Sequence, residues 1–332
     1  MPDERRPTLT DVAIRAGVSK SLVSLVMRDE RGASPETRRR VLEAADELGY
    51  HPDSRARLLR SGRSRLLGVV FGIQHPFHAD LVTGLYSAAR ETGYELALSA
   101  VTPERDESEA IRGLRQDRCE ALILLGPHSS AAALTELAAR IPVTVLARGL
   151  KIEGIDVVRT ADATGTAQAV DHVVSLGHRR IAHIDGGRSP GAADRRRGYR
   201  SAMKRHGLEP YIWIVPGGLT EEVGAVAARE LLNNLPTAVT VFNDRCATGV
   251  LDAFTRANVQ VPRDISVVGY DDSSLARLAH INLTTIAQDV PTMTRQAITR
   301  LVARLEGTAV AGRESVIPPE LIIRGTTAPP RT

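Results

Sequence analysis

A chain of 332 residues, 42% hydrophobic and 25% charged, has the composition of an ordinary globular protein and the length of two or three domains. No apolar run approaches the ~18 residues that a membrane helix needs, and the polar, charged residues 1–10 do not form a signal peptide. Cys119 and Cys246 lie far apart in different apolar segments, so we expect buried, reduced thiols in a cytoplasmic protein rather than a disulfide or a metal site.

Positive charge gathers at the N-terminus. Residues 1–65 carry fourteen Arg and Lys against ten Asp and Glu, whereas the remaining residues carry 29 of each sign. Because the phosphate backbone dominates affinity for nucleic acids, a basic head on a neutral body favours nucleic-acid binding. A basic terminal segment is also compatible with a merely solvated surface, so charge alone leaves both interpretations open.

The first motif is a short helix, a turn and a second helix. Thr8 can cap the first helix, with Asp11 as the reciprocal carboxylate of a capping box. Gly17 follows this helix at a point where a positive φ is needed. Ser19 then caps a second helix over about residues 20–28.

The second helix has an apolar face that we expect to pack inside the headpiece, formed by Val23, Val26 and Met27. Leu22 and Leu25 lie on another face, where leucine suits contact with thymine methyl groups in a major groove. A third predicted helix begins at the Ser-Pro pair of residues 34–35 and ends at Gly49. Three helices within fifty residues predict helix-turn-helix architecture, although spacing alone is equally compatible with a small helical bundle that binds no DNA.

Six strings in this region are more specific than the spacing: Asp11-Val12-Ala13, Ala16-Gly17-Val18-Ser19, Val23-Ser24, Thr37-Arg38, Leu48-Gly49-Tyr50 and Pro52. From Thr8 to about Gly68, without gaps, the chain resembles the headpiece of the lactose-repressor/purine-repressor family. The resemblance implies two sets of DNA contacts, to base edges from Lys20 and Ser21 and to phosphates from Thr8, Ser19 and Ser24. We add Leu22 and Leu25 to the base contacts and Arg28 to the phosphate contacts. Many members carry Arg in place of Leu25 and Asn in place of Arg28, so no member's operator half-site can be transferred.

Residues 53–65 form a short, Arg-rich segment between two predicted domains. A free peptide of this length is too short for a stable helix, so a flexible, solvated linker is one interpretation. Beside a helix-turn-helix, the segment can instead fold in the minor groove, where a leucine wedges between base pairs and kinks the duplex. The family resemblance assigns that wedge to Leu59, paired with its counterpart across a dyad, and places Ala56 one turn earlier on the same face.

From residue 66 onward, predicted strands alternate with predicted helices. We expect strands over residues 66–73, 95–100, 121–125, 141–146, 181–185, 211–215, 238–242 and 266–270, and helices over 80–91, 107–115, from 164 onward, 197–206 and 221–233. Repeated strand–helix–strand units predict parallel sheets with helices on both faces. Ligands of such sheets bind outside the carboxyl ends of the strands, here in a cleft between two lobes.

The predicted fold class is an all-α helix-turn-helix headpiece followed by an α/β periplasmic-binding-protein-like domain of two doubly wound parallel-sheet lobes. We expect the headpiece over residues 1–52, the hinge over 53–65 and the effector-binding domain over 66–328. Within that domain, lobe 1 is expected at about 66–176 and 290–315, and lobe 2 at about 177–289 and 316–328.

Specific strings recur in the second domain: Leu176-Gly177-His178-Arg179-Arg180-Ile181-Ala182, Arg195-Arg196-Arg197-Gly198-Tyr199, Asn243-Asp244, residues 261–272 and Leu283-Thr284-Thr285-Ile286. They resemble the same family, which implies that the polar groups of a small-molecule effector are bound by Arg195, Asn243 and Asp271, with Phe77 and Gln74 contributing from lobe 1. An Arg fork and a carboxylate suit a hydroxyl-rich ligand. A surface salt bridge for Arg195 and a turn cap for Asp271 are the alternatives.

Two departures from the family pattern bear on the ligand. Leu219 stands where sugar-responsive members often carry an aromatic residue, and Thr164 stands where some carry Asp. A sugar effector is therefore compatible with the sequence but not required by it.

The leading hypothesis is a sequence-specific DNA-binding transcriptional regulator, most often a repressor, that binds a palindromic double-stranded operator as a homodimer, with a tetramer left open. Its effector would act by binding two lobe arrangements with different affinities. The alternative is a solute-binding protein of a transporter, which the headpiece and the missing signal peptide disfavour. We expect no enzyme, since no HExxH or GxSxG motif occurs, and no cofactor, metal or membrane partner.

Overall fold

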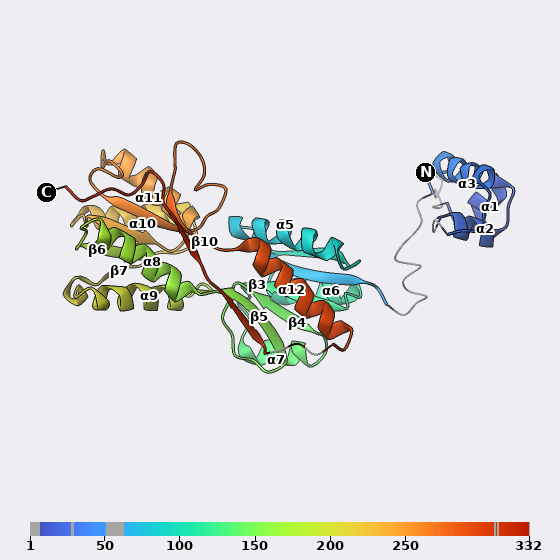
Figure 1. The fold of residues 1–332 in the computed structure, drawn as a ribbon, viewed down its shortest axis with the longest axis horizontal. Helices are drawn as coiled ribbons and strands as arrows, with labels where there is room; N and C mark the ends of the chain where they lie inside the picture. The colour runs from blue at the N-terminus through green and yellow to red at the C-terminus, as the bar shows by residue number, and fades with distance from the viewer. Residues whose placement is uncertain (1–6, 28–29, 51–62, 309, 311, 332) are drawn as a thin grey trace. The chain divides into compact units, whose positions relative to one another are not determined.

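The computed structural model describes residues 7–27, 30–50, 63–308, 310 and 312–331. The chain divides into two compact units, residues 1–64 and 65–332 (Figure 1). Among the described helices, none is both long and apolar enough to cross a membrane. Three residues of the predicted DNA contacts, Arg28, Ala56 and Leu59, lie outside the described residues.

The first unit contains the three predicted helices, α1 (Leu9–Ala16), α2 (Lys20–Met27) and α3 (Pro35–Glu47). The predicted capping box is confirmed, because the Thr8 side chain accepts the Asp11 N–H and the Asp11 carboxylate accepts the Thr8 N–H. Gly17 ends α1 at a φ of 64°. The small core of this unit is centred on Val12, Val23, Val26 and Val41.

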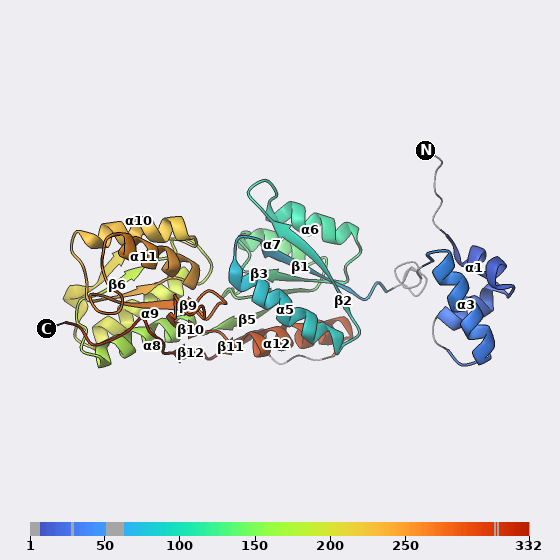
Figure 2. The same ribbon diagram turned by 90° about the horizontal axis from the view of Figure 1, so that it is seen from above.

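The second unit begins with a six-stranded parallel sheet of order β11-β5-β4-β3-β1-β2, the sheet of lobe 1. Its strands are β1 (Leu66–Gly72), β2 (Glu95–Val101), β3 (Ala121–Leu125), β4 (Val143–Leu146), β5 (Ile155–Thr160) and β11 (Glu314–Ile317). One face is covered by α5 (Pro76–Arg90) and α12 (Val290–Leu305), which lie side by side in Figures 1 and 2. The other face is covered by α6 (Glu107–Gln116) and α7 (Ala131–Ala138).

Lobe 2 repeats this plan with a sheet of order β12-β10-β9-β8-β6-β7. Its strands are β6 (Ile181–Ile184), β7 (Trp213–Val215), β8 (Ala238–Val241), β9 (Ser266–Asp271), β10 (Thr284–Ala287) and β12 (Glu320–Ile322), the last antiparallel to β10. One face packs against α8 (Asp162–Ser175) and α9 (Ala192–Arg205). A 3₁₀ turn, η1 (Glu209–Tyr211), connects α9 to β7. The other face packs against α10 (Glu221–Leu232) and α11 (Asp244–Arg256).

The expected division of the lobes at residue 176 differs from the structure. It assigned α8 to lobe 1, but Ala169, Val170 and Val173 of α8 pack in one cluster with Tyr199 and Tyr270 of lobe 2. The chain therefore changes lobe between β5 and α8 rather than after α8. It returns to lobe 1 between β10 and α12, because α12 packs on the sheet of lobe 1. It crosses to lobe 2 again between β11 and β12, because β11 pairs with β5 and β12 pairs with β10.

Several element boundaries also differ from the prediction. The helices expected from residues 80, 164 and 197 begin earlier, at Pro76, Asp162 and Ala192. The elements that were not predicted are strands β5, β10, β11 and β12 and helices α7, α11 and α12. The strand expected from residue 211 begins at Trp213 after η1. Cys119 and Cys246 are buried thiols that are not joined in a disulfide, as expected.

Candidate DNA-binding and ligand-binding sites

The first turn of α2 presents the predicted DNA contacts of the headpiece. Ser19, Lys20 and Ser21 are exposed, whereas Val23 and Val26 face the core. The Ser19 hydroxyl oxygen accepts the Leu22 N–H at 3.2 Å, which confirms the predicted cap and leaves the hydroxyl hydrogen able to donate to a phosphate.

Four other predicted contacts are less accessible. Ser24, Leu22 and Leu25 are half-buried, and Leu25 lies over Gly32, where an added Cβ would come within 3.2 Å of a Leu25 methyl group. Thr8 gives both of its donors to Asp11, its N–H at 2.7 Å and its hydroxyl at 2.6 Å. Thr8 could therefore hold a phosphate only if one of these bonds were exchanged.

In the second unit, four of the five predicted effector residues meet at one small cavity of about 50 Å³ between the lobes, namely Phe77, Arg195, Asn243 and Asp271. Asn243 follows β8 and Asp271 ends β9, so both lie at the carboxyl ends of neighbouring parallel strands. Gln74 does not line this cavity. It lines a larger cavity beside it, and its carbonyl oxygen accepts a hydrogen bond from Arg245 of lobe 2.

Arg195 is the most constrained of these residues. Its Nε donates to Asp162 at 2.8 Å and its Nη1 donates to the Phe242 carbonyl oxygen at 2.5 Å. Its guanidinium carbon lies 3.5 Å from the Tyr270 ring centroid and 4.6 Å from that of Phe242. Only 6% of Arg195 is exposed, so the surface salt bridge considered from the sequence is wrong.

Asp271 and Asn243 are also held by protein contacts. Asp271 accepts a hydrogen bond from Gln288 at 2.8 Å and lies 3.6 Å from Arg195 Nη2. Burial raises the pKa of the Asp271 carboxyl, against the opposing effect of Arg195. The Asn243 side chain caps α11 by accepting the Cys246 N–H at 2.8 Å, and it donates to the Leu219 carbonyl oxygen at 3.3 Å. The cavity is thus built from groups whose orientation is set before any ligand binds.

Sequence reasoning missed several residues of this site. Asp162 and Gln288 hold Arg195 and Asp271, and Asp162 is itself buried. The predicted helix began at Thr164, so no local signal separated Asp162 from an ordinary loop acid. His75 and His78 line both cavities. Phe77, which lies between them in the sequence, was predicted to contact the effector, and a chemical role for its neighbouring histidines could have been considered from the sequence.

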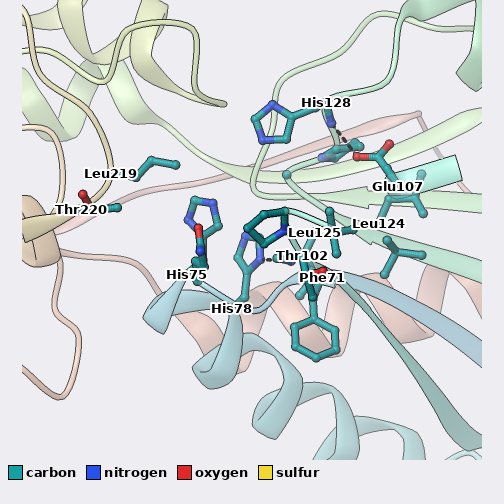
Figure 3. A pocket seen from close by; sticks show the side chains of 17 residues that line it. Phe71, His75, His78, Thr102, Glu107, Leu124, Leu125, His128, Leu219 and Thr220 are labelled. Carbon is teal, nitrogen blue, oxygen red and sulfur yellow. Dashed lines mark hydrogen bonds between the residues drawn. The ribbon is translucent and has the colours of Figure 1, made fainter. Parts of the chain in front are cut away.

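The larger cavity, of about 290 Å³, shares His75 and His78 with the first, and Figure 3 shows the side chains that line it. Its lobe 1 wall comes from the carboxyl ends of β1, β2 and β3, and lobe 2 contributes Leu219 and Thr220. The His75 and His78 rings stack with centroids 4.6 Å apart. In the part of the chain that the structure describes, no group of three or more His, Cys, Asp or Glu side chains could hold a metal ion.

Both stacked histidines are neutral at pH 7. Burial, with the nearby His128 and Arg245, lowers the pKa of His75 to about 4. Burial and His75 lower the pKa of His78 to about 3. His78 Nδ1 accepts the Gly72 N–H at 3.0 Å, so the proton of the neutral ring is on Nε2.

The depressed histidine pKa values predict an acid-sensitive fold. Below pH 6.5 His78 is protonated in the unfolded chain but stays neutral in the folded protein. The contribution of this histidine to stability therefore falls as pH decreases toward its folded pKa. His78→Asn keeps an acceptor for the Gly72 N–H and removes this titration. Between pH 7 and pH 5 we expect the variant to lose roughly 1–2 kcal/mol less unfolding free energy than the wild type.

Urea unfolding at the two pH values measures this difference. The raised pKa values of Asp271 and Asp244 act with the opposite sign in both proteins, so they cancel in the comparison. His280→Asn, at an exposed histidine of the same unit, is the matched control and should follow the wild type. An equal pH dependence in wild type and His78→Asn would show that His78 titrates alike in the folded and unfolded states.

Comparison with known proteins gives consistent matches to both units. Residues 8–53 match the model for bacterial regulatory proteins of the lacI family, and residues 170–327 match a periplasmic binding protein-like domain. The ribose operon repressor of Escherichia coli (strain K12) is 34% identical over 331 residues, which cover 96% of this chain and 99% of that repressor.

Two solved structures extend the comparison. A LacI transcriptional regulator from a Rhodococcus species is 50% identical, with a TM-score of 0.77 over 80% of this chain and 98% of that chain. The lac repressor dimer bound to operator and the anti-inducer ONPF is 30% identical, with a TM-score of 0.81 over 98% of this chain and 100% of that chain. The predicted headpiece and two-lobed fold are confirmed by these matches.

Proposed function

This chain belongs to the lacI family of bacterial regulatory proteins and is a DNA-binding transcriptional regulator, and from that premise we propose that it represses transcription as a homodimer on a palindromic operator. A small molecule bound between the lobes would change its affinity for that operator. The ribose operon repressor supports a sugar or sugar-like ligand as the first class to consider.

The observation that carries the DNA-binding proposal is the exposed first turn of α2. Lys20 and Ser21 project from a helix whose opposite face, with Val23 and Val26, is buried in the headpiece core. A recognition helix needs this arrangement, because one face must hold the domain together while the other reads base edges. Leu22 and Leu25 complete the proposed base-contacting face, and Ser19 and Ser24 the phosphate contacts. Thr8 and Arg28, together with Ala56 and Leu59 of the hinge, remain part of the proposal.

Lys20→Ala is expected to change which operator sequence is preferred, because a base-edge contact is worth about 1–3 kcal/mol of discrimination at one position. Selection of binding sites from a random DNA pool, followed by footprinting, measures the consensus. Arg15→Ala removes the same charge from an exposed residue paired with Glu47, so it is the matched control and should keep the wild-type consensus. Recovery of the wild-type consensus with Lys20→Ala would contradict the assignment of this residue.

The solute-binding alternative makes a different prediction for the same experiment. A transport protein would bind its ligand without selecting any sequence from the pool. The match of residues 8–53 to the lacI family model favours the regulator.

A further inference from the structure

Arg245 of lobe 2 extends toward lobe 1 from a rigid base. It is the second residue of α11, and its Nε donates to the carboxylate of Glu221, the first residue of α10, at 2.6 Å. The two helices approach each other closely here, since a Cβ added at Gly249 would lie 1.9 Å from the Glu221 carbonyl oxygen. Only 22% of the Arg245 side chain is exposed. The guanidinium is therefore held in place by lobe 2 itself.

The same guanidinium also contacts lobe 1. Its Nη1 donates to the main-chain carbonyl oxygen of Gln74, in the turn that follows β1. The charge of Arg245 also reaches His75, where it adds to the effect of burial in lowering the pKa. Among the described residues, the other hydrogen bonds between the lobes, such as that of Thr160 with Gln288 at 2.6 Å, lie where the chain crosses from one lobe to the other. Arg245 thus joins the lobes away from the connecting segments.

Both ends of this contact border the larger cavity. Gln74 lines the cavity from lobe 1, and Thr220, which precedes Glu221 in the chain, lines it from lobe 2. A molecule that enters the cavity therefore touches the two segments that Arg245 joins. Such a molecule can bind the joined and the separated segments with different affinities, which is what regulation by a ligand requires.

We propose that Arg245 is a latch between the lobes, in which Glu221 positions the guanidinium and the Gln74 carbonyl oxygen receives it. The latch sets the balance between the arrangement described above and a second, unlatched arrangement before any ligand binds. Loss of one hydrogen bond from a charged group changes such a balance by about 10-fold. This inference rests on the proposed function, because operator affinity is the property that the balance controls.

Pulsed electron paramagnetic resonance on the full-length protein measures the balance directly. Nitroxide labels at Thr135→Cys on α7 and Ser201→Cys on α9, two exposed positions in different lobes, report the distance between the lobes, whereas Cys119 and Cys246 are buried. Mixing with an excess of unlabelled protein restricts the signal to distances within one chain. We expect one dominant distance in the wild type and a second distance in Arg245→Ala, with the ratio of the two changed by about 10-fold.

Two further variants separate the latch from the general effect of losing an arginine. Arg256→Ala, on the same helix, removes an exposed arginine paired with Asp252 and should keep the wild-type distances. Glu221→Gln weakens the base of the latch and should shift the ratio in the same direction as Arg245→Ala, but by less. In the Arg245→Ala background it should add nothing, because both residues act through one contact. Unchanged distances in Arg245→Ala, or an equal shift in Arg256→Ala, would overturn the proposal.

Operator affinity without any added ligand tests the regulatory part of the proposal. On an operator that the wild type selects from a random pool, the affinity of Arg245→Ala should differ from that of the wild type by about fivefold or more. Arg256→Ala should bind like the wild type. A residue that only contacts a ligand would not change operator binding in its absence, so shifted distances with an unchanged operator affinity would also overturn the proposal.

The two measurements fail separately. A wild-type protein that selects no operator would contradict the proposed function, whatever its lobes do. The distances between the labels would still decide whether Arg245 holds the lobes together, because that measurement needs no DNA.

Discussion

Arg195→Ala is expected to lower the free energy of unfolding of the second unit by about 3–5 kcal/mol, because it leaves buried carboxylates without their partner. The Asp162 and Asp271 side chains are 5% and 11% exposed, and both lie next to the Arg195 guanidinium in the wild type. The variant also loses the stacking of that group on Tyr270. The melting temperature should fall by roughly 10 °C, and calorimetry or circular dichroism would measure it.

A matched control lies on the same helix. Arg205 pairs with Asp171 on the surface, where the two side chains are 52% and 43% exposed. Arg205→Ala should therefore cost at most about 1 kcal/mol. A second control is Asp162→Asn in the Arg195→Ala background, which removes one unpaired carboxylate and should restore part of the lost stability.

The stability of the Arg195→Ala variant should also depend on pH, in a direction that the buried carboxyls determine. Burial raises the pKa of the Asp271 carboxyl, and removing Arg195 removes the charge that opposes this effect, so the pKa of Asp271 in the folded variant lies further above its value in the unfolded chain. The folded variant then binds more protons than the unfolded chain, and its stability rises as pH falls toward the ordinary range of Asp. Loss of stability equal to that of Arg205→Ala, with no gain at lower pH, would show that Arg195 does not balance these carboxylates.

The same substitution bears on regulation. If effector binding weakens operator binding, Arg195→Ala should stay on the operator in the presence of effector. If effector promotes operator binding, the variant should bind operator poorly throughout. These outcomes have meaning only at a temperature well below the lowered melting point of the variant, because partial unfolding would mimic loss of response.

The family resemblance assigned Asn243 and Asp271 to the proposed ligand site, and their places along the chain agree with that assignment. Asn243 lies two residues after the end of β8, and Asp271 is the last residue of β9. The carboxyl ends of these adjacent parallel strands meet at one edge of the sheet. Asp162 could not be located in this way. It pairs with Arg195, 33 residues further along the chain, and α8 begins there without a side-chain cap that would have marked its first residue.

The lobe boundary was misplaced for a related reason. An apolar face such as Ala169, Val170 and Val173 predicts that a helix is covered, but not which sheet covers it. The crossing point lies after β5, and β5 was not recognised because its six residues include Asp156 and Arg159. The carboxylate of Asp156 can be buried in a strand because Arg304 of α12 donates hydrogen bonds to both of its oxygens, at 2.8 and 3.0 Å. That partner is 148 residues away, beyond the reach of any local pattern.

Gly198→Ala is expected to destabilise the second unit by about 1–3 kcal/mol through crowding between α8 and α9. A Cβ added at Gly198 would lie 2.2 Å from the Ala163 carbonyl oxygen, so the backbones of the two helices would have to separate. Any such separation would disturb Asp162 and Arg195, which lie on these two helices and hold each other at 2.8 Å. Effector response should therefore weaken together with stability.

Gly113→Ala provides the opposite result within the same unit. Gly113 is inside α6, and its added Cβ would meet only the end of the flexible Arg105 side chain, at 3.3 Å. Alanine should there stabilise the unit by about 0.5–1 kcal/mol, since a helix interior favours it over glycine. Urea unfolding of the two variants would separate crowding between helices from the helix preference of alanine, because both variants replace a helical glycine by alanine. A loss of stability at Gly113 equal to that at Gly198 would mean that close helix approach is not what requires glycine at position 198.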